Sequence, residues 1–291
     1  MATRLGPHGV PEVKPAGVAT TARDARGSEP LPGFRRRPLL LWQVALTLLV
    51  IFGYDAVNNL AAKRALSAVG HGRDILRFEQ GIGLDPERAL NRWLAVHRSL
   101  GTFANYFYDN AHFVITFGLL AALWWWRPER YRYLRDALFA VNVVGLIVFW
   151  ALPVAPPRLI GLGFVDTVDA FRTVGSFHSG ALAADANQFA AMPSLHLGYA
   201  IWSTLAILAL VRGRRGWAAA VCRWVAWAYP VLVALTVMAT ANHYLADAVA
   251  GLAATGVGLA VATALQRVHT RWQAWRIARV LGRTPTRTAT G

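Results

Sequence analysis

The residues with the clearest capacity for chemistry are a histidine and an aspartate four positions apart, His243 and Asp247. On a helix, residues at this spacing lie on one face, one turn from each other. The carboxylate can then accept a hydrogen bond from one imidazole nitrogen, which makes the other nitrogen a better nucleophile or base. The same spacing also fits a buried polar pair that only joins two helices.

Two further segments combine polar groups with apolar surroundings. Residues 191–196 contain Pro193, Ser194 and His196. A Pro-Ser pair can open a helix, whose free N–H groups suit a phosphate, and a histidine there can protonate a leaving oxygen. Residues 153–158 end in Arg158, whose guanidinium matches a phosphate group. The alternative for residues 191–196 is a capping turn with an interfacial histidine. The alternative for Arg158 is an ordinary interfacial arginine.

The elements that must position these residues are membrane helices. Of the 291 residues, 55% are hydrophobic and only 15% are charged, whereas a soluble domain carries about 25% charged residues. Six apolar blocks each approach the ~20 residues that cross a bilayer. They predict an all-α fold, a polytopic membrane helix bundle with six transmembrane helices. The blocks are residues 38–59, 102–126, 134–153, 195–211, 217–240 and 244–266.

The basic residues orient these helices. A net charge of +15 would suit nucleic acid, but the arginines flank the apolar blocks and form no single soluble face, so we expect no nucleic-acid partner. Arginine clusters precede the first block, follow the sixth, and separate the second from the third and the fourth from the fifth. Because such clusters stay in the cytoplasm, both termini are predicted to be cytoplasmic. The arginine-rich loop after the first block opposes this orientation.

This topology brings the three polar segments to one membrane level. The third and fifth blocks then run outward, and the fourth and sixth run inward. Arg158, His196 and His243 therefore all lie on the extracytoplasmic side of the cell membrane. Since the topology was derived from arginines alone, the coincidence indicates one shared site.

The chain is predicted to divide into three regions. Residues 1–33 form a disordered cytoplasmic tail, residues 34–266 form the six-helix transmembrane domain, and residues 267–291 form a basic cytoplasmic tail. In the loop after the first block, Asp85 and Pro86 predict the start of an interfacial helix. The residues expected on one face of that helix are Leu90, Trp93, Leu94 and His97.

Together the polar segments resemble the type-2 phosphatidic acid phosphatase superfamily, and most of all its inositolphosphotransferase (inositol phosphorylceramide synthase-like) branch. The Pro-Ser-x-His core matches residues 193–196, and the His-x-x-x-Asp core matches residues 243–247. The Ala-Pro-Pro-Arg segment, residues 155–158, looks like that branch's form of the first motif. Two superfamily cations are absent, because Ala151 replaces a lysine and Val237 replaces an arginine. A polar segment at 105–112 also looks like that branch, so Tyr108 and His112 are expected to line the site.

The resemblance implies a metal-independent enzyme without cofactors that acts on a membrane lipid phosphate. By analogy, His243 attacks phosphorus to form a phosphohistidine, which Asp247 orients and stabilises. His196 protonates the leaving oxygen and then activates the acceptor, while Arg158 and the amides near Ser194 hold the phosphoryl oxygens. With water as acceptor the chain is a lipid phosphatase, and with a polyol hydroxyl it is a phosphotransferase. The alternatives are a non-catalytic transporter or scaffold of the same fold, and a haem protein with histidine ligands.

Overall fold

The computed structural model describes residues 38–49, 64–173 and 188–280. The predictions for residues 1–33 and 281–291, and for the second half of the first apolar block, lie outside the described residues. Within the described ranges every regular element is a helix, and extended pairing is limited to an isolated bridge between Val154 and Ala190. The all-α prediction is therefore confirmed for this part of the chain.

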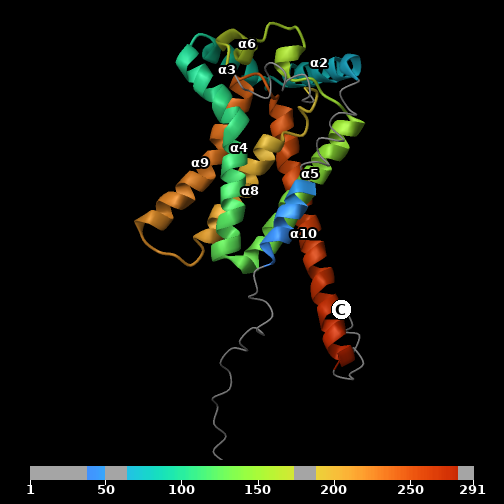
Figure 1. Cartoon of the computed structure of the whole chain (residues 1–291). Coiled ribbons are helices and arrows are strands. Elements are labelled where there is room, and N and C mark those ends of the chain that lie inside the picture. Colours follow the sequence, from blue (N-terminus) through green and yellow to red (C-terminus); the bar gives the residue numbers. More distant parts are fainter. Residues whose placement is uncertain (1–37, 50–63, 174–187, 281–291) are drawn as a thin grey trace, which may run out of the picture. The chain divides into compact units, whose positions relative to one another are not determined.

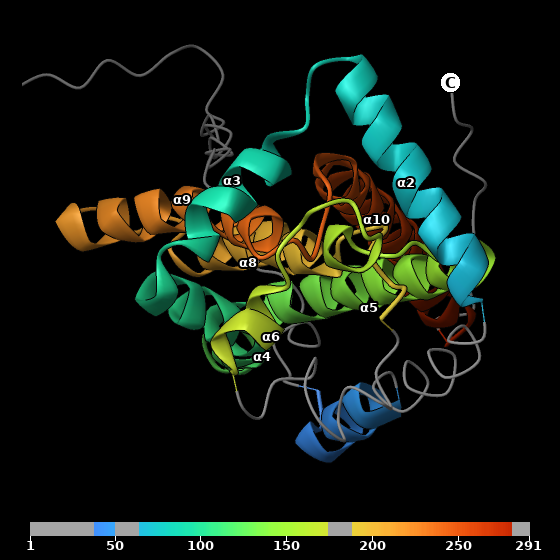
Figure 2. The ribbon, with the colours of Figure 1, turned by 90° about the horizontal axis from the view of Figure 1, so that it is seen from above.

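The long helices agree with the apolar blocks of the sequence. α10 packs along α5, and α8 contacts α4, α5, α9 and α10 (Figures 1 and 2). α5 begins at Pro128, earlier than expected, because a proline suits the first helical turn. α10 continues as one helix well beyond residue 266, where a separate tail was predicted. The long helices are α4 (Arg98–Trp126), α5 (Pro128–Ala151), α8 (Leu195–Leu210), α9 (Trp217–Ala239) and α10 (Leu245–Val280).

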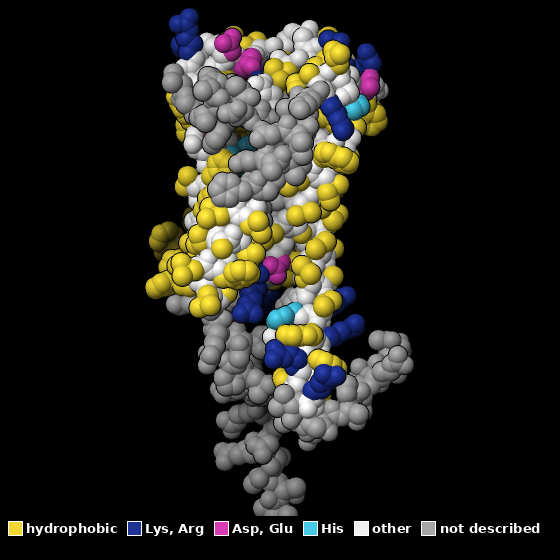
Figure 3. Space-filling model, turned by 45° about the vertical axis from the view of Figure 1, so that its right-hand side comes forward, with side chains coloured by type: hydrophobic (Ala, Val, Ile, Leu, Met, Phe, Trp, Pro, Cys, Tyr) yellow, Lys and Arg dark blue, Asp and Glu magenta, His cyan; other side chains and the backbone are white. Residues whose placement is uncertain are grey.

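Three of these helices, α5, α9 and α10, are long and apolar enough to cross a membrane. Hydrophobic side chains cover the middle of the face in Figure 3, and Lys and Arg side chains lie towards its two ends. α8 and a helix at Leu40–Leu49 are apolar but shorter. α4 is long, at 29 residues, but buried polar side chains such as Asn105 and Asp109 lower its hydropathy. The six-span topology therefore stays a prediction.

Short helices gather at the end of the bundle where α4, α8 and α10 begin (Figure 1). We call this group the cap. The start signal at Asp85 and Pro86 predicts α3, whereas no sequence pattern predicts α2. The members of the cap are α2 (Ala65–Gly81), α3 (Pro86–Ala95), the 3-10 helix η2 (Pro157–Leu159) and α6 (Thr167–Phe171).

α3 starts at Pro86 as predicted, and Trp93 and His97 of the predicted face contact each other with ring centroids 4.5 Å apart. Glu87, Asn91 and Leu94 form the buried face, whereas Trp93 is 53% exposed. α3 packs against α9 and α4, and this packing buries Glu87 and Asn91 in addition to Leu94. Asp85 stands at the N-cap position without forming a side-chain capping bond.

The starts of α8 and α10 touch through their backbones. A Cβ atom added to Gly251 of α10 would lie 2.4 Å from the carbonyl oxygen of Ser194, so a glycine is needed for this approach. The backbone N–H of Ser194 donates to the carbonyl oxygen of Asp247 at 2.9 Å. The segments that contain His196 and His243 are therefore joined before their side chains are considered.

Candidate active site

His243 lies two residues before the start of α10 and is buried. Its Nδ1 is 2.9 Å from the carbonyl oxygen of Ala191 and 3.3 Å from Oδ2 of Asp247. A carbonyl oxygen can only accept, so this partner assigns the hydrogen of the neutral imidazole to Nδ1 and the lone pair to Nε2. Nε2 has no hydrogen-bond partner among the described residues. The ring thus presents an unshared nucleophilic nitrogen in a buried site.

Asp247 reaches His243 by folding back over the first turn of α10. Its Oδ2 also accepts from the backbone N–H of Tyr244 at 2.9 Å. This is one of the two bonds of a capping box, in which the side chain of the third helical residue accepts from the backbone N–H of the N-cap residue. The two side chains therefore meet as the four-residue spacing predicts, but His243 is outside the helix and not one turn along it.

His196 joins this pair from the first turn of α8. Its ring stacks on that of Tyr108 with centroids 4.1 Å apart, and lies 4.4 Å from the ring of His112. The His196 and His243 ring centroids are 5.6 Å apart. Four of the residues singled out in the sequence, from α4, α8 and the start of α10, thus form one cluster of rings.

Ser194 has a structural task in this arrangement. It is fully buried, and its Oγ accepts from the backbone N–H of Leu197 at 3.4 Å, which caps α8. Its own N–H is bonded to Asp247. The helix start predicted from Pro193 and Ser194 is therefore present.

Arg158 is fixed to the loop that precedes His243. Its backbone N–H donates to the carbonyl oxygen of Ala241 at 3.0 Å, and its Nε donates to Oδ1 of Asn242 at 2.9 Å. Its Nη1 forms an ion pair with Oδ2 of Asp166 at 2.9 Å. Asp166 in turn caps α6 through Oδ1. These bonds hold the guanidinium in a defined position next to the histidine segment.

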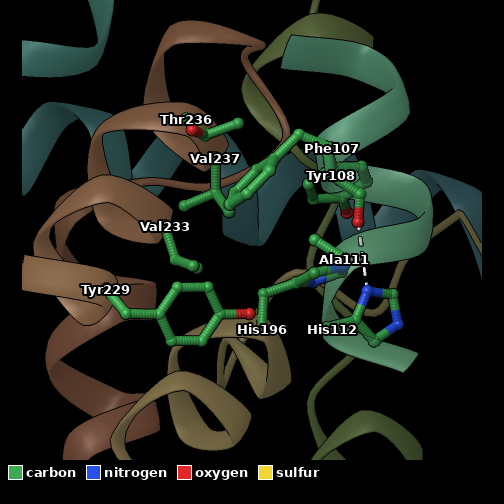
Figure 4. Close-up of a pocket in the computed structure, with 9 residues that line it drawn as sticks. All are labelled: Phe107, Tyr108, Ala111, His112, His196, Tyr229, Val233, Thr236 and Val237. Carbon is green, nitrogen blue, oxygen red and sulfur yellow. Dashed lines mark hydrogen bonds between the residues drawn. The ribbon is translucent and has the colours of Figure 1, made fainter. Parts of the chain in front are cut away.

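A pocket lies beside His196 between α4, α8 and α9 (Figure 4). Its side chains nearly fill it, and the free volume inside is about 10 Å³, roughly the room for one water molecule. In Figure 4 the phenol of Tyr229 points from α9 towards His196. Val237, where the family resemblance leads one to expect an arginine, belongs to the apolar wall. The lining residues are Phe107, Tyr108, Ala111, His112, His196, Tyr229, Val233, Thr236 and Val237.

Three further residues, Asn242, Asp166 and Tyr229, lie at the site but are not among the predicted site residues. Asn242 directly precedes His243 in the sequence, and this adjacency could have marked it as a site residue. Asp166 and Tyr229 carry no such signal, since they reach the site only through tertiary contacts. In the described part of the chain, no group of three or more His, Cys, Asp or Glu residues is arranged to hold a metal ion.

Comparisons with known proteins place these motifs in a family. Residues 73–261 match the family model of the PAP2 superfamily. A stretch of 166 residues is 28% identical to phosphoinositol dihydroceramide synthase of Bacteroides thetaiotaomicron, and it covers 50% of this chain and 49% of that relative. The match thus spans about half the length of the curated relative. The search of solved structures gave no significant match.

Proposed function

The chain belongs to the PAP2 superfamily, and from this premise we propose that it is an integral membrane enzyme that transfers a lipid-borne phosphoryl group through a phosphohistidine on His243. The observation that carries the proposal is the hydrogen bonding of His243. Nδ1 is engaged by Ala191 and Asp247, which leaves Nε2 with the lone pair. A buried, oriented imidazole nitrogen next to a second histidine is the arrangement that nucleophilic catalysis with a separate proton donor requires.

In the first step, Nε2 of His243 attacks phosphorus and the bond from phosphorus to the leaving oxygen breaks. His196 supplies the proton that the leaving oxygen needs. Asp247 balances the positive charge that develops on the imidazole. Arg158 and the N–H groups at the start of α8 stabilise the charge on the phosphoryl oxygens, which is worth most in a water-poor site.

In the second step, His196 removes a proton from the acceptor, whose oxygen then bonds to phosphorus while the phosphorus–nitrogen bond breaks. Water as acceptor gives a lipid phosphatase, and a hydroxyl gives a phosphotransferase. The name of the relative, a phosphoinositol dihydroceramide synthase, favours transfer of phosphoinositol to a lipid hydroxyl. We therefore rank transfer first and hydrolysis second.

We further propose that α4, α8 and the region around the helix at Leu40–Leu49 complete a six-span topology with both termini in the cytoplasm. The cap and the candidate active site then face the extracytoplasmic side. A reporter fused after residue 170 is expected to read as extracytoplasmic. A cytoplasmic readout would place the site on the wrong face for this proposal.

The function is tested with the purified full-length protein in detergent. The protein is incubated with phosphatidylinositol, phosphatidic acid and prenyl phosphates, each labelled with ³²P, with and without ceramide as acceptor. We expect an acid-labile, alkali-stable phosphoenzyme in the wild type, none in His243→Ala, and slow formation in His196→Ala. His269→Ala is the matched control, because this histidine of α10 is exposed and hydrogen-bonds to Gln273 on the same helix. Full turnover in His243→Ala contradicts the mechanism, and a wild type inert towards the whole panel favours a scaffold.

A further inference from the structure

The first turn of α10 is capped from a distant helix. The residue before α10 is Tyr244, whose side chain lacks the short acceptor of a capping residue and donates its hydroxyl to the carbonyl oxygen of Ala155 at 3.0 Å. The backbone N–H of Ala246 donates instead to Oε1 of Glu79 at 2.6 Å. Glu79 belongs to α2 and lies 167 positions earlier in the chain. Asp247, the next residue, carries the carboxylate that contacts His243.

Glu79 is one of two buried carboxyl groups at this place. Glu79 is 2% exposed and Glu87 of α3 is 0% exposed, and the two carboxyl groups are close enough to influence each other's pKa. Burial and the neighbouring Glu87 raise the pKa of Glu79 to about 9. Glu79 therefore keeps its proton at neutral pH, so it can donate to Glu87 while its carbonyl oxygen accepts from Ala246.

The backbone of α2 must come very close for Glu79 to reach α10. The buried face of α2 comprises Ala68, Gly72, Leu76 and Glu79. A Cβ atom on Gly72 would lie 2.5 Å from the carbonyl oxygen of Ala155 and 2.7 Å from Oη of Tyr244. Burying two carboxyl groups costs free energy unless they are bonded, and the proposed reaction steps use neither group. The contact of Glu79 with the turn that carries Asp247 gives that carboxyl group a structural task.

We propose that Glu79 and Glu87 are a positioning pair: Glu79 holds the N–H of Ala246, fixes the first turn of α10, and thereby sets Asp247 against His243. Neither glutamate touches the reacting atoms. The pair acts through the backbone of α10 on the orientation of the imidazole. This inference rests on the proposed role of His243.

The pair also predicts a pH dependence. The titratable groups that act on Glu79 are Glu87 of α3 and Asp247 of α10, and Tyr244 lies beside them. The folded protein keeps the Glu79 proton up to pH about 9, whereas the unfolded chain releases it near 4.5. Stability is therefore highest below pH 4.5 for this group and falls as pH rises through this window. Above pH 9 an ionised Glu79 would repel Glu87 and Asp247, so activity should fall there.

The test compares Glu79→Gln with Glu79→Ala in the full-length protein. Gln keeps an acceptor for Ala246 and a donor for Glu87, whereas Ala keeps neither. We expect Glu79→Ala to lower kcat at least ~10-fold with little change in KM, because a misplacement of ~1 Å can cost up to ~100-fold. Glu79→Gln should keep the wild-type kcat at pH 7 and move the alkaline limb of the pH profile upward. Gln80→Ala, an exposed neighbour on α2, should match the wild type.

A second readout does not depend on turnover. Selective ¹⁵N-histidine labelling, with His243→Gln to identify the signals, reports the tautomer of His243. We expect wild-type signals in Glu79→Gln and altered signals in Glu79→Ala. Wild-type kcat and signals in Glu79→Ala would overturn the proposal, and so would equal losses in both variants. If Glu79→Ala does not fold, an unchanged alkaline limb in Glu79→Gln overturns it. An inactive wild type would instead refute the proposed function, while the His243 signals still test the positioning.

Discussion

The candidate site has two sides that are built by different interactions. On the polar side, next to the cap, hydrogen bonds to the backbone or to one another hold Arg158, Asn242, His243 and Asp247. On the pocket side, between α4, α8 and α9, the walls are mostly aromatic and apolar. His196 lies where the two sides meet, since it lines the pocket and stands 5.6 Å from the His243 ring.

This difference separates the two demands on a lipid-modifying enzyme. Bond making requires reacting groups that stay within a fraction of an ångström of a fixed geometry, which directional hydrogen bonds provide. A lipid requires apolar surface, which is less directional and tolerates side chains of similar volume. Substitutions on the polar side should therefore lower kcat, whereas substitutions on the pocket side should change KM and substrate preference.

The largest effect is expected for Asp247→Asn on the polar side. The amide has nearly the same shape, but it has no charge to balance the imidazolium of His243. We expect kcat to fall by about 10⁴-fold with KM little changed, in line with the loss of an orienting carboxylate in other triads. The rate of phosphoenzyme formation, measured in a single turnover, is the relevant quantity.

The control for this substitution is Asp169→Asn, in which an exposed carboxylate of α6 is neutralised. It should leave the rate of phosphoenzyme formation within a factor of two of the wild type. A loss below 10-fold in Asp247→Asn would mean that the polar side does not depend on this charge.

The next largest effect is expected for Arg158→Lys. The guanidinium donates from Nε to Asn242 and from Nη1 to Asp166, and a lysine ammonium cannot reproduce this fork. Bonds to charged groups are worth ~1.5–3 kcal/mol each, so kcat/KM should fall by about 10- to 100-fold. Steady-state kinetics with the best lipid of the panel measure the loss.

Arg77→Lys provides the comparison, because Arg77 forms an exposed ion pair with Asp74 on α2. Exposed pairs contribute ~0–1 kcal/mol, so this variant should keep its kcat/KM within a few-fold. Equal kinetics in the two variants would show that the anchored geometry of Arg158 is unimportant.

The sequence predicted the polar side better than the pocket side, for a physical reason. His196, His243, Asp247 and Arg158 lie in short segments whose chemistry is visible in the spacing itself. The pocket wall contributed by Tyr229 and Val233 depends on how α9 packs against α4 and α8, which no local pattern specifies. The cap was largely missed too, because the contact between Glu79 and Ala246 joins residues 167 positions apart.

The helices show the same division. Hydrophobic blocks located α4, α5, α8, α9 and α10 within a few residues at most ends. The continuation of α10 through Arg267 and Arg271 was missed, because charge was taken to mark the end of the membrane helix. Arginine is a good helix former, so the charge marks where the hydrophobic surface ends and not where the helix ends.

A smaller effect is expected where the cap meets the polar side. Gly72→Ala places a methyl group against Ala155 and Tyr244, and overpacking of this kind costs about 1–3 kcal/mol. We expect a lower thermal midpoint in detergent and a moderate loss of kcat, because the start of α10 shifts. Gly70→Ala is the matched control on the same helix, since a Cβ there meets nothing within 4 Å. If Gly72→Ala melts at the same temperature as Gly70→Ala, the close approach of α2 to Ala155 and Tyr244 does not contribute to stability.

The smallest effect is expected on the pocket side, from a pair of changes at Val233. This side chain is buried in the pocket wall opposite His196. Val233→Ala widens the pocket and Val233→Leu narrows it, so their KM values for lipids with saturated and unsaturated chains should move in opposite directions. One methylene in an apolar pocket is worth ~1 kcal/mol at its lower limit, or about 5-fold.

The decisive comparison is between KM and the single-turnover rate. Val231→Ala, on the exposed face of the same helix, should change neither quantity. In both Val233 variants the rate of phosphoenzyme formation should stay within about two-fold of the wild type, because apolar packing adapts to small volume changes at a cost below ~1.5 kcal/mol. A loss as large as that of Asp247→Asn would mean that the pocket wall also holds the reacting groups. The two sides would then act as one rigid unit, and the division between fixed chemistry and adaptable binding would not hold for this protein.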